Sequence, residues 1–327
     1  MTKKKIVVSG IRSTGPLHVG HYFGALKSWI ELQEKYECYF FVADWHALTT
    51  DFKDPSQIKT YLLDNVSDWL ALGVDPKKAA LFIQSSVPEH AELYLALSMI
   101  TPLGWLERNP TYKDQKEALK HKDLSNLGFL GYPVLQAADI ALYQGELVPV
   151  GEDQVPHLEL SREIIRRFNH LYGETLVEPQ PILSASPRVL GSDGRKMSNS
   201  YQNAVLLSDP EEVVTKKVMT YMTDPARKRR QDPGDPKKCP LYSLHELFTE
   251  EKTLKEVDLG CRTAKIGCVD CKKTLLQRLT PWHQSYTEKR KALNPKTVQK
   301  VLDEGQKKAS AVAQKTMTEV KKALKIL

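Results

Sequence analysis

From its N-terminus to about residue 190, the chain alternates short apolar runs with longer segments of helical periodicity, and this alternation limits the folds available to it. Four runs have the length and apolar composition of buried strands, at residues 6–8, 38–43, 81–84 and 147–150. The segments between them repeat apolar residues at helical spacing, as in Phe23, Leu26 and Ile30. Strands separated by helices pair in parallel, because each helix returns the chain to the same end of the sheet. The pattern therefore predicts an α/β fold with a Rossmann-like parallel sheet.

Beyond about residue 184 the character of the sequence changes. Residues 184–201 are rich in Gly, Ser, Asp, Pro and basic side chains, which is typical of a mobile loop. Residues 211–222 and 298–327 have the pattern of amphipathic helices rich in Lys, Glu and Ala. We therefore predict two domains: an α/β domain over residues 1–200, with a functional loop at 191–200, and an all-helical C-terminal domain over 201–327.

The segment from residue 8 to residue 21, VSGIRSTGPLHVGH, runs from the first expected strand through a glycine-bearing turn into a helix. Free backbone N–H groups and the positive end of a helix dipole converge at such a turn, which suits it to bind an anion. His18 and His21 are three residues apart, so both rings can face one point, and Gly20 leaves the backbone open to a nucleotide. Two imidazoles aimed at one phosphate would stabilise the charge that develops in an in-line displacement. Taken alone, the pattern fits two structural histidines equally well.

A second basic segment, GRKMSNS at residues 194–200, lies on the expected loop. A lysine on a loop can close over a leaving pyrophosphate and hold it as charge develops, although a basic linker has the same composition. Together the two segments resemble the HIGH and KMSKS signatures of the class I aminoacyl-tRNA synthetases, as His18-Val19-Gly20-His21 and Lys196-Met197-Ser198-Asn199-Ser200. The resemblance implies that the first signature binds ATP and stabilises the adenylation transition state. It also implies that the second closes over the pyrophosphate.

By this resemblance the expected catalytic residues are His18, His21 and Lys196. The ATP-binding residues that it implies are Arg12, Ser13, Thr14, Gly20, His21, Gly151, Glu152, Asp153, Val189, Lys196, Met197, Ser198, Asn199 and Ser200. Mg²⁺ is expected to neutralise the leaving pyrophosphate. The chain departs from the family pattern at Asn199, where a second lysine is usual, and at Arg12, where glutamine is frequent. We hypothesise that Arg195 supplies part of the charge lost at position 199.

Three further segments resemble the tryptophanyl branch of this family, at residues 44–47 (DWHA), 132–140 (YPVLQAADI) and 148–154 (VPVGEDQ). The tryptophan-binding residues that the resemblance implies are Val8, His46, Tyr132, Gln136, Asp139 and Gln154. In this assignment Asp139 accepts the indole N–H, while Gln154 and Tyr132 hold the amino group. The chemistry is consistent, because indole offers one donor and no acceptor, and a side chain without that donor would leave a buried carboxylate unpaired. The implied activity is activation of L-tryptophan with ATP and its transfer to tRNA(Trp).

Three alternatives remain open from the sequence. A tyrosyl-tRNA synthetase has a similar Gln-Ala-x-Asp run, but it typically carries a tyrosine where this chain has Val8, and Ser-Asp-Gln where this chain has Glu152-Asp153-Gln154. A nucleotidylyltransferase can share the His-x-Gly-His turn, yet it needs neither the indole motif nor a long helical domain. A non-catalytic tRNA-binding paralogue is compatible with Asn199.

Four of the five cysteines are grouped late in the chain, at Cys239, Cys261, Cys268 and Cys271. Four thiolates can hold tetrahedral zinc or an iron–sulfur cluster, and their spacing alone does not choose between them. A subset of bacterial tryptophanyl enzymes is similar to this chain here and carries a [4Fe–4S] cluster near its anticodon-binding surface, which favours the cluster over Zn²⁺. The fifth residue, Cys38, lies in the second expected strand and is predicted to be structural.

The 327 residues carry a net charge of +7, and positive side chains are concentrated at residues 226–238. Such a stretch can bind a polyanion, so the helical domain is expected to bind the anticodon region of the tRNA. The sequence shows no signal-peptide or transmembrane pattern, and a cytoplasmic location without membrane contact is expected. The family resemblance also implies a homodimer.

Overall fold

The computed structural model describes residues 4–109, 112, 124–151, 154–183 and 189–327. Contacts within the chain divide it into two compact units. The first unit comprises Met1–Gly15, Ser28–Ala185 and Asn294–Leu327, and the second comprises Pro16–Lys27 and Ser186–Leu293. Each unit is therefore assembled from segments that are far apart in the sequence.

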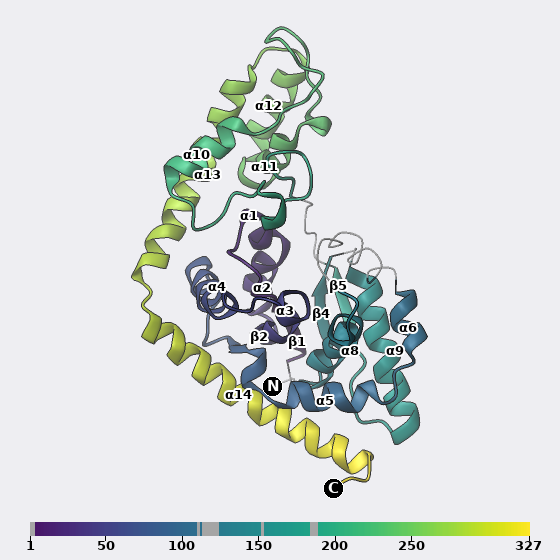
Figure 1. Ribbon diagram of the computed structural model, residues 1–327. Coiled ribbons are helices and arrows are strands. Elements are labelled where there is room, and N and C mark those ends of the chain that lie inside the picture. Colours follow the sequence, from purple (N-terminus) through teal and green to yellow (C-terminus); the bar gives the residue numbers. More distant parts are fainter. Residues whose placement is uncertain (1–3, 110–111, 113–123, 152–153, 184–188) are drawn as a thin grey trace. The chain divides into compact units, whose positions relative to one another are not determined.

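The first unit is built on a five-stranded parallel sheet with the strand order β3-β2-β1-β4-β5 (Figure 1). Its strands are β1 (Ile6–Ile11), β2 (Glu37–Val42), β3 (Ala79–Ile83), β4 (Leu147–Val150) and β5 (Gln180–Leu183). The order runs outward from β1 to β3 and then resumes on the other side of β1 with β4. An open α/β sheet binds its ligands at such a reversal, beyond the carboxyl ends of the strands.

Helices connect successive strands of this sheet and bury its faces, which confirms the predicted α/β class. They are α2 (Lys27–Leu32), α3 (Asp44–Asp51), α4 (Ile58–Leu72), α5 (Glu89–Ser98), α6 (Leu103–Arg108), α8 (Leu127–Ala141) and α9 (Val155–Tyr172). Side chains from strands and helices share one core, in which Val8, Phe82 and Phe168 are fully buried. None of the helices in the described part of the chain has the length and apolar character that a bilayer-spanning segment needs.

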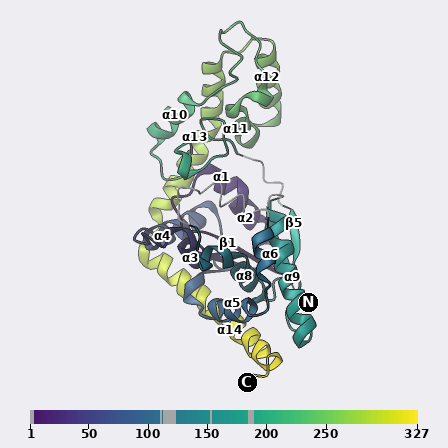
Figure 2. The same cartoon turned by 45° about the vertical axis from the view of Figure 1, so that its right-hand side comes forward.

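The long C-terminal helix α14 (Pro295–Ala323), yellow in Figures 1 and 2, packs along the edge strand β3. Gly305 permits this close approach, because a Cβ atom at that position would lie 1.8 Å from the carbonyl oxygen of Leu81. Gln306 Nε2 also donates to the carbonyl oxygen of Ser86 at 2.8 Å. The helix therefore covers an edge that would otherwise be open to pairing with another strand.

The second unit is helical. Its helices are α1 (Val19–His21), which continues into a π-helical turn η1 (Tyr22–Leu26), α10 (Glu211–Thr220), α11 (Pro240–Phe248), α12 (Glu251–Arg262) and α13 (Cys268–Ala292). Two backbone hydrogen bonds join the start of this unit to its later part, from Val19 N to Val205 O at 3.0 Å and from Leu207 N to Leu17 O at 2.9 Å. This pairing explains why residues 16–27 belong with the helical segments.

The structure confirms the four predicted strands and the helices over residues 211–222 and 298–327, and it adds β5. The sequence pattern did not predict β5, because Pro179 precedes the strand and Pro181 lies within it. Proline is tolerated there because β5 is an edge strand, in which Pro181 lies opposite Val148. The two units do not coincide with the predicted boundary at residue 200. Helix α14 packs with the sheet, and residues 16–27 pack with the helical unit.

Candidate active site

His18 and His21 lie side by side at the start of α1, in the second unit. Their ring centroids are 3.8 Å apart and their planes are inclined by 28°. The backbone N–H of His18 donates to Nδ1 of His21 at 3.2 Å. Because Nδ1 of a neutral His21 accepts this bond, its Nε2 carries the proton and is a donor. The structure confirms that one helical turn brings both rings to the same place.

Both imidazoles are neutral at pH 7. Burial, then His21 and then Lys196 lower the pKa of His18 to about 3. Burial and Lys196 lower the pKa of His21 to about 4. Lys196 of the second signature is therefore close enough to act on both rings. A neutral imidazole can donate a hydrogen bond without carrying charge, and the positive charge beside the two rings comes from Lys196.

Gly20 determines where the ring of His18 can lie. A Cβ atom on Gly20 would be 2.9 Å from both Cε1 and Nδ1 of His18, and 3.6 Å from Sδ of Met197. Any larger residue at position 20 would therefore displace the imidazole. The glycine is needed for the histidine pair itself, in addition to the expected approach of a nucleotide.

The second signature lies on a tight turn, in which Leu190 and Lys196 pair in antiparallel fashion. Val189 and Met197 are buried in the core of the second unit, whereas Lys196 between them is exposed. Gly194 has a φ of 82°, which an L side chain rarely adopts. The buried residues anchor the turn, and Lys196 projects from it. Of the loop predicted at 184–201, residues 184–188 lie outside the described residues.

Asn203 holds this turn from within, and the sequence interpretation did not include it. Its Oδ1 accepts from Ser198 N at 2.8 Å, and its Nδ2 donates to Asp193 Oδ1 at 2.7 Å. Gly191 gives it room, because a Cβ atom there would lie 2.2 Å from Cγ of Asn203. An asparagine close to a Gly- and Ser-rich loop is too common a feature to be recognised from sequence. Ser200 N also donates to Ser198 Oγ at 3.3 Å.

The position that departs from the family pattern has a structural contact. Nδ2 of Asn199 donates to the carbonyl oxygen of Pro16 at 2.9 Å and so ties the signature turn to the segment before His18. Arg195 forms an ion pair with Asp193, with 2.6 Å between Nη2 and Oδ2, and its guanidinium lies 4.0 Å from the ring centroid of Tyr201. In this structure Arg195 is engaged within the turn.

Asp139 on α8 is the centre of a buried hydrogen-bond cluster in the first unit, with only 3% of its surface exposed. Its Oδ2 lies 2.8 Å from His46 Nε2, and its Oδ1 lies 2.7 Å from Gln84 Nε2 and 2.6 Å from His90 Nδ1. Burial raises the pKa of Asp139, but hydrogen bonds from His46 and His90 outweigh it and leave the pKa below its ordinary value. The carboxylate is therefore ionised, as an acceptor for an N–H group requires.

Three members of this cluster were missed from the sequence, namely Gln84, His90 and Tyr143. Gln84 directly follows β3, and its Oε1 accepts from the backbone N–H of Trp45 at 3.1 Å. His90 Nε2 lies 2.7 Å from the hydroxyl of Tyr143. A polar residue at the carboxyl end of a parallel strand was a usable signal for Gln84. The other two are completely buried and have no local pattern that separates them from core residues.

Arg12 and Tyr132, assigned to the ATP and tryptophan sites, belong to one neighbourhood at the end of β1. The surrounding protein lowers the pKa of the Arg12 guanidinium, whereas Asp51 and Tyr132 raise it. Arg12 nevertheless remains exposed to solvent. The Tyr132 hydroxyl lies 3.3 Å from His157 Nε2.

The remaining predicted residues of the first unit vary in exposure. Ser13 is buried and Thr14 is exposed. Val8 is a core residue and is only 1% exposed. Gly145 packs against it, because a Cβ atom on Gly145 would lie 2.8 Å from Cγ2 of Val8. Gln136 is half-buried on α8, and Gln154 precedes α9 with its backbone N–H donating to Gly151 O at 2.9 Å. Glu152 and Asp153 lie outside the described residues.

The four grouped cysteines come from helix ends of the second unit: Cys239 before α11, Cys261 in the last turn of α12, and Cys268 and Cys271 in the first turn of α13. Burial raises the pKa of Cys271 to about 12, and the charges of the other three thiols contribute to the shift. The four sulfur atoms therefore face one region. Within the described residues, no group of three or more His, Cys, Asp or Glu is arranged to hold a single metal ion.

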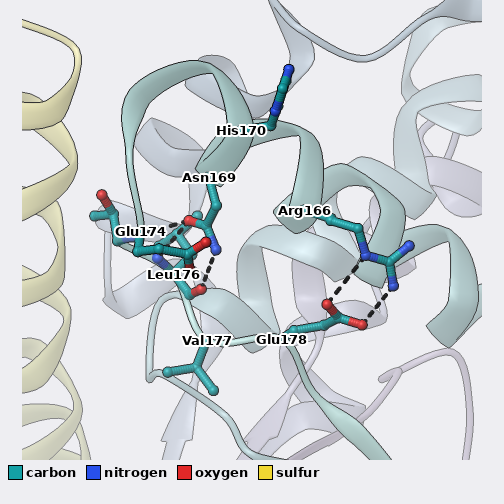
Figure 3. A pocket seen from close by; sticks show the side chains of 8 residues that line it. Arg166, Asn169, His170, Glu174, Leu176, Val177 and Glu178 are labelled. Carbon is teal, nitrogen blue, oxygen red and sulfur yellow. Dashed lines mark hydrogen bonds and ion pairs between the residues drawn. The ribbon is translucent and has the colours of Figure 1, made fainter.

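Two other features lie apart from these sites. Cys38 is buried in β2, its Sγ lies 3.7 Å from Tyr36 O, and burial raises its pKa to about 12, which is consistent with the structural role predicted for it. A surface pocket of about 520 Å³ at the end of α9 (Figure 3) contains none of the predicted site residues. Its main polar groups pair with one another, as Arg166 does with Glu178 and Asn169 with the backbone of Leu176.

Comparison with known proteins places the chain in a family. A family model described as class I tRNA synthetases (W and Y) matches residues 1–283. The chain is 52% identical to the tryptophan–tRNA ligase of Thermotoga maritima and 44% identical to that of Aquifex aeolicus, and each alignment covers 98% of this chain and 99% of the relative. The solved structure of tryptophanyl-tRNA synthetase from Campylobacter jejuni, complexed with ADP and tryptophan, superimposes with a TM-score of 0.86 at 34% identity, covering 98% of this chain and 99% of that one. The chain therefore belongs to the class I aminoacyl-tRNA synthetases, within the group of bacterial tryptophan–tRNA ligases.

Proposed function

We propose that the chain joins L-tryptophan and ATP to give tryptophanyl-adenylate and pyrophosphate, and then transfers the tryptophanyl group to the terminal ribose of tRNA(Trp). The observation that carries this proposal is the stacked, neutral pair of His18 and His21 with Lys196 beside it. In adenylation the carboxylate of tryptophan attacks the α-phosphate, and the bond from this phosphate to pyrophosphate breaks. Negative charge grows on the phosphate oxygens during this step.

The two signatures have complementary parts in this step. The Nε2–H of His21 donates to an oxygen of the α-phosphate, and His18 packs against that ring and fixes its orientation. Loss of one such donor in an enzyme site typically lowers kcat by about 10² to 10³. Lys196 projects from an anchored turn and neutralises the pyrophosphate as it leaves. Mg²⁺, when bound with ATP, would neutralise further charge on the phosphates. Asn199 is neutral and donates to the carbonyl oxygen of Pro16, so the positive charge of this signature comes from Lys196.

Tryptophan recognition follows from the cluster around Asp139. Its ionised carboxylate accepts the indole N–H, and His46 lies beside the same oxygen atom. A site built around such a bond rejects analogues that lack the donor by about 10⁴ to 10⁵. Tyr132 and Gln154 are proposed to hold the amino group of the substrate, and Arg12 is proposed to contact ATP.

Amino-acid-dependent exchange of pyrophosphate into ATP tests the first reaction. We expect exchange with tryptophan and much less with tyrosine or phenylalanine, and we expect His21→Ala to lower its rate by about 10² or more. Gln306→Ala, which changes a contact between α14 and Ser86, is the control. Faster exchange with tyrosine than with tryptophan would identify a tyrosyl enzyme. If no amino acid supported exchange, the chain would instead be a non-catalytic tRNA-binding paralogue. Adenylate formation without charging of tRNA would favour a nucleotidylyltransferase.

We also propose that Cys239, Cys261, Cys268 and Cys271 hold a [4Fe–4S] cluster. Four thiols from three helices face one region, and a four-iron cluster, being larger than an ion, needs its ligands further apart than zinc does. The cluster is preferred over zinc because these cysteines resemble those of the tryptophanyl enzymes that carry a [4Fe–4S] cluster. Arg227 Nη1 lies 3.8 Å from Cys261 Sγ, where a cation would offset thiolate charge. When bound, the cluster would join the ends of α11, α12 and α13.

Metal analysis of anaerobically purified protein tests this proposal. We expect about four iron and four sulfide per chain, brown colour, and loss of both in Cys271→Ser, whereas Cys38→Ser keeps them. Colourless protein that contains zinc and no iron would contradict the cluster.

We further propose that the second unit binds the anticodon region of tRNA(Trp) through the basic side chains of residues 227–230. Three of these four residues are exposed, and they lie beside the cysteine group through the contact of Arg227 with Cys261. Replacing Arg229 and Arg230 by alanine should raise the KM for tRNA and leave pyrophosphate exchange unchanged, because that assay contains no tRNA. A variant with an unchanged KM for tRNA would exclude this surface.

A homodimer is proposed on the basis of an exposed apolar patch on α5, α6 and α8, formed by Leu95, Met99, Leu103 and Leu127. Each of these residues has more than half of its surface exposed. Met99 directly follows α5, and α5 and α6 each pack against α8. Monomeric proteins rarely leave such patches in water. We expect light scattering to give twice the chain mass for the wild type and the single mass for Met99→Glu. A wild-type monomer at micromolar concentration would contradict the dimer.

A further inference from the structure

We propose that His90 is a positioning residue that sets the specificity for tryptophan. His90 and Gln84 both donate hydrogen bonds to Oδ1 of Asp139. A single acceptor position, on Oδ2, then remains for the one N–H group of indole. This inference rests on the proposed function, in which Asp139 receives the indole N–H.

Counting donors and acceptors leads to this assignment. An ionised carboxylate has about four lone-pair positions, two on each oxygen. Gln84 Nε2 and His90 Nδ1 fill both positions on Oδ1, at 2.7 Å and 2.6 Å. His46 Nε2 fills one position on Oδ2 at 2.8 Å. One position remains among these contacts, and it matches the single donor of the indole ring.

The two donors on Oδ1 are themselves held by other groups. The backbone N–H of Trp45 donates to Oε1 of Gln84, which directs the amide NH₂ group towards Asp139. The Tyr143 hydroxyl lies 2.7 Å from Nε2 of His90. Burial raises the pKa of Tyr143 well above its ordinary value, so Tyr143 stays protonated and donates to Nε2. His90 then carries its proton on Nδ1 and donates to Asp139.

Exposure indicates which oxygen faces the substrate. The side chain of His90 is 0% exposed and that of Asp139 is 4% exposed, whereas that of His46, the partner of Oδ2, is 12% exposed. The Oδ1 side is therefore closed, and the Oδ2 side lies nearer to solvent. Removing the His90 donor would vacate a position on the closed side. The carboxylate could then turn, and the bond to indole would lose its fixed direction.

The test compares tryptophan with 3-(benzothiophen-3-yl)alanine, in which sulfur replaces the indole N–H at nearly the same size. In pyrophosphate exchange the wild type should prefer tryptophan by about 10⁴ in kcat/KM. His90→Ala should reduce this preference on the order of 10- to 100-fold. The loss should appear in the KM for tryptophan, while the kcat and the kinetics of the analogue remain near those of the wild type.

Three further variants separate positioning from a general structural effect. His90→Asn keeps a donor near the Nδ1 position and should restore most of the preference. Tyr143→Phe, which also covers the case in which His90→Ala does not fold, should give a smaller loss of preference. Tyr39→Phe is the matched control, because Tyr39 stacks on Tyr143 with centroids 4.8 Å apart but directs its hydroxyl to Glu37. It should leave the preference unchanged.

The role of His90 and the proposed activity are distinguished by different outcomes. The role of His90 would be overturned, while tryptophan activation stands, if His90→Ala lowered kcat/KM equally for tryptophan and for the analogue. An unchanged preference in both His90→Ala and Tyr143→Phe would overturn it as well. A wild-type enzyme that activates both substrates equally would overturn the role of Asp139. A wild-type enzyme that does not activate tryptophan would overturn the proposed function itself.

Discussion

Replacing Gly20 by alanine should slow adenylation without weakening the fold. The new Cβ atom would lie 2.9 Å from the His18 ring, which must retreat by roughly 0.5 Å to reach the 3.4 Å at which ordinary contact begins. A displacement of about 1 Å in a catalytic group costs about 10² in rate, and loss of a phosphate donor costs about 10² to 10³. We therefore expect the kcat of tryptophan-dependent pyrophosphate exchange to fall by about 10- to 100-fold. The free energy of unfolding should stay level or rise by up to about 1 kcal/mol, because alanine favours a helix more than glycine does.

Gly24→Ala is the matched control, since Gly24 lies in the same helical segment and a Cβ atom there would meet nothing within 4 Å. It should raise stability in the same way and keep the wild-type kcat. Urea unfolding and exchange kinetics on the same preparations give both quantities. Gly20→Ala with an unchanged kcat would refute the link between the position of the His18 ring and catalysis. A loss of rate that followed a loss of stability would refute it equally.

Two further predictions follow from the described contacts. The folded pKa values of His18 and His21, about 3 and about 4, lie below the ordinary 6.5. Their contribution to the free energy of unfolding is therefore complete above pH 6.5, and it is lost as the pH falls from 6.5 through about 4 for His21 and about 3 for His18. NMR signals of both rings should not titrate between about pH 5.5 and 8, and a midpoint near 6.5 would show that the rings are solvated instead. Gly305→Ala should lower the free energy of unfolding by about 1 to 3 kcal/mol or more, because its Cβ atom meets the backbone of Leu81; a urea midpoint equal to that of the wild type would show that α14 does not pack closely on β3.

Local patterns were sufficient to predict the signatures and most of the sheet. The three-residue spacing of His18 and His21 predicts that both rings can face one point, whereas their stacked arrangement appears only in the structure. The first four strands are apolar runs of strand length, and each is recognisable without knowledge of its neighbours. Gly20 was assigned to the nucleotide site from the motif, although its contact with His18 appears only when the ring is placed.

Contacts between residues far apart in the sequence could not be predicted from local patterns. His90 and Asp139 are 49 residues apart, and Gln306 and Ser86 are 220 apart. No periodicity links such pairs, because their proximity results from the packing of whole elements. For the same reason the amphipathic pattern of α14 predicted a helix correctly but did not show that the helix returns to the sheet. Strand β5 was not predicted, because Pro181 weakens the strand pattern of this segment. The proline is tolerated because β5 is an edge strand that pairs on one side only.

Charging of purified tRNA(Trp) with radiolabelled tryptophan tests adenylation and transfer together, because it requires both reactions in succession. We expect ATP-dependent accumulation of tryptophanyl-tRNA(Trp), no charging of tRNA(Tyr), and a strongly reduced rate for Asp139→Ala. Folded wild-type protein that charges tRNA with tyrosine, or that charges no tRNA while it binds ATP, would contradict the proposed function.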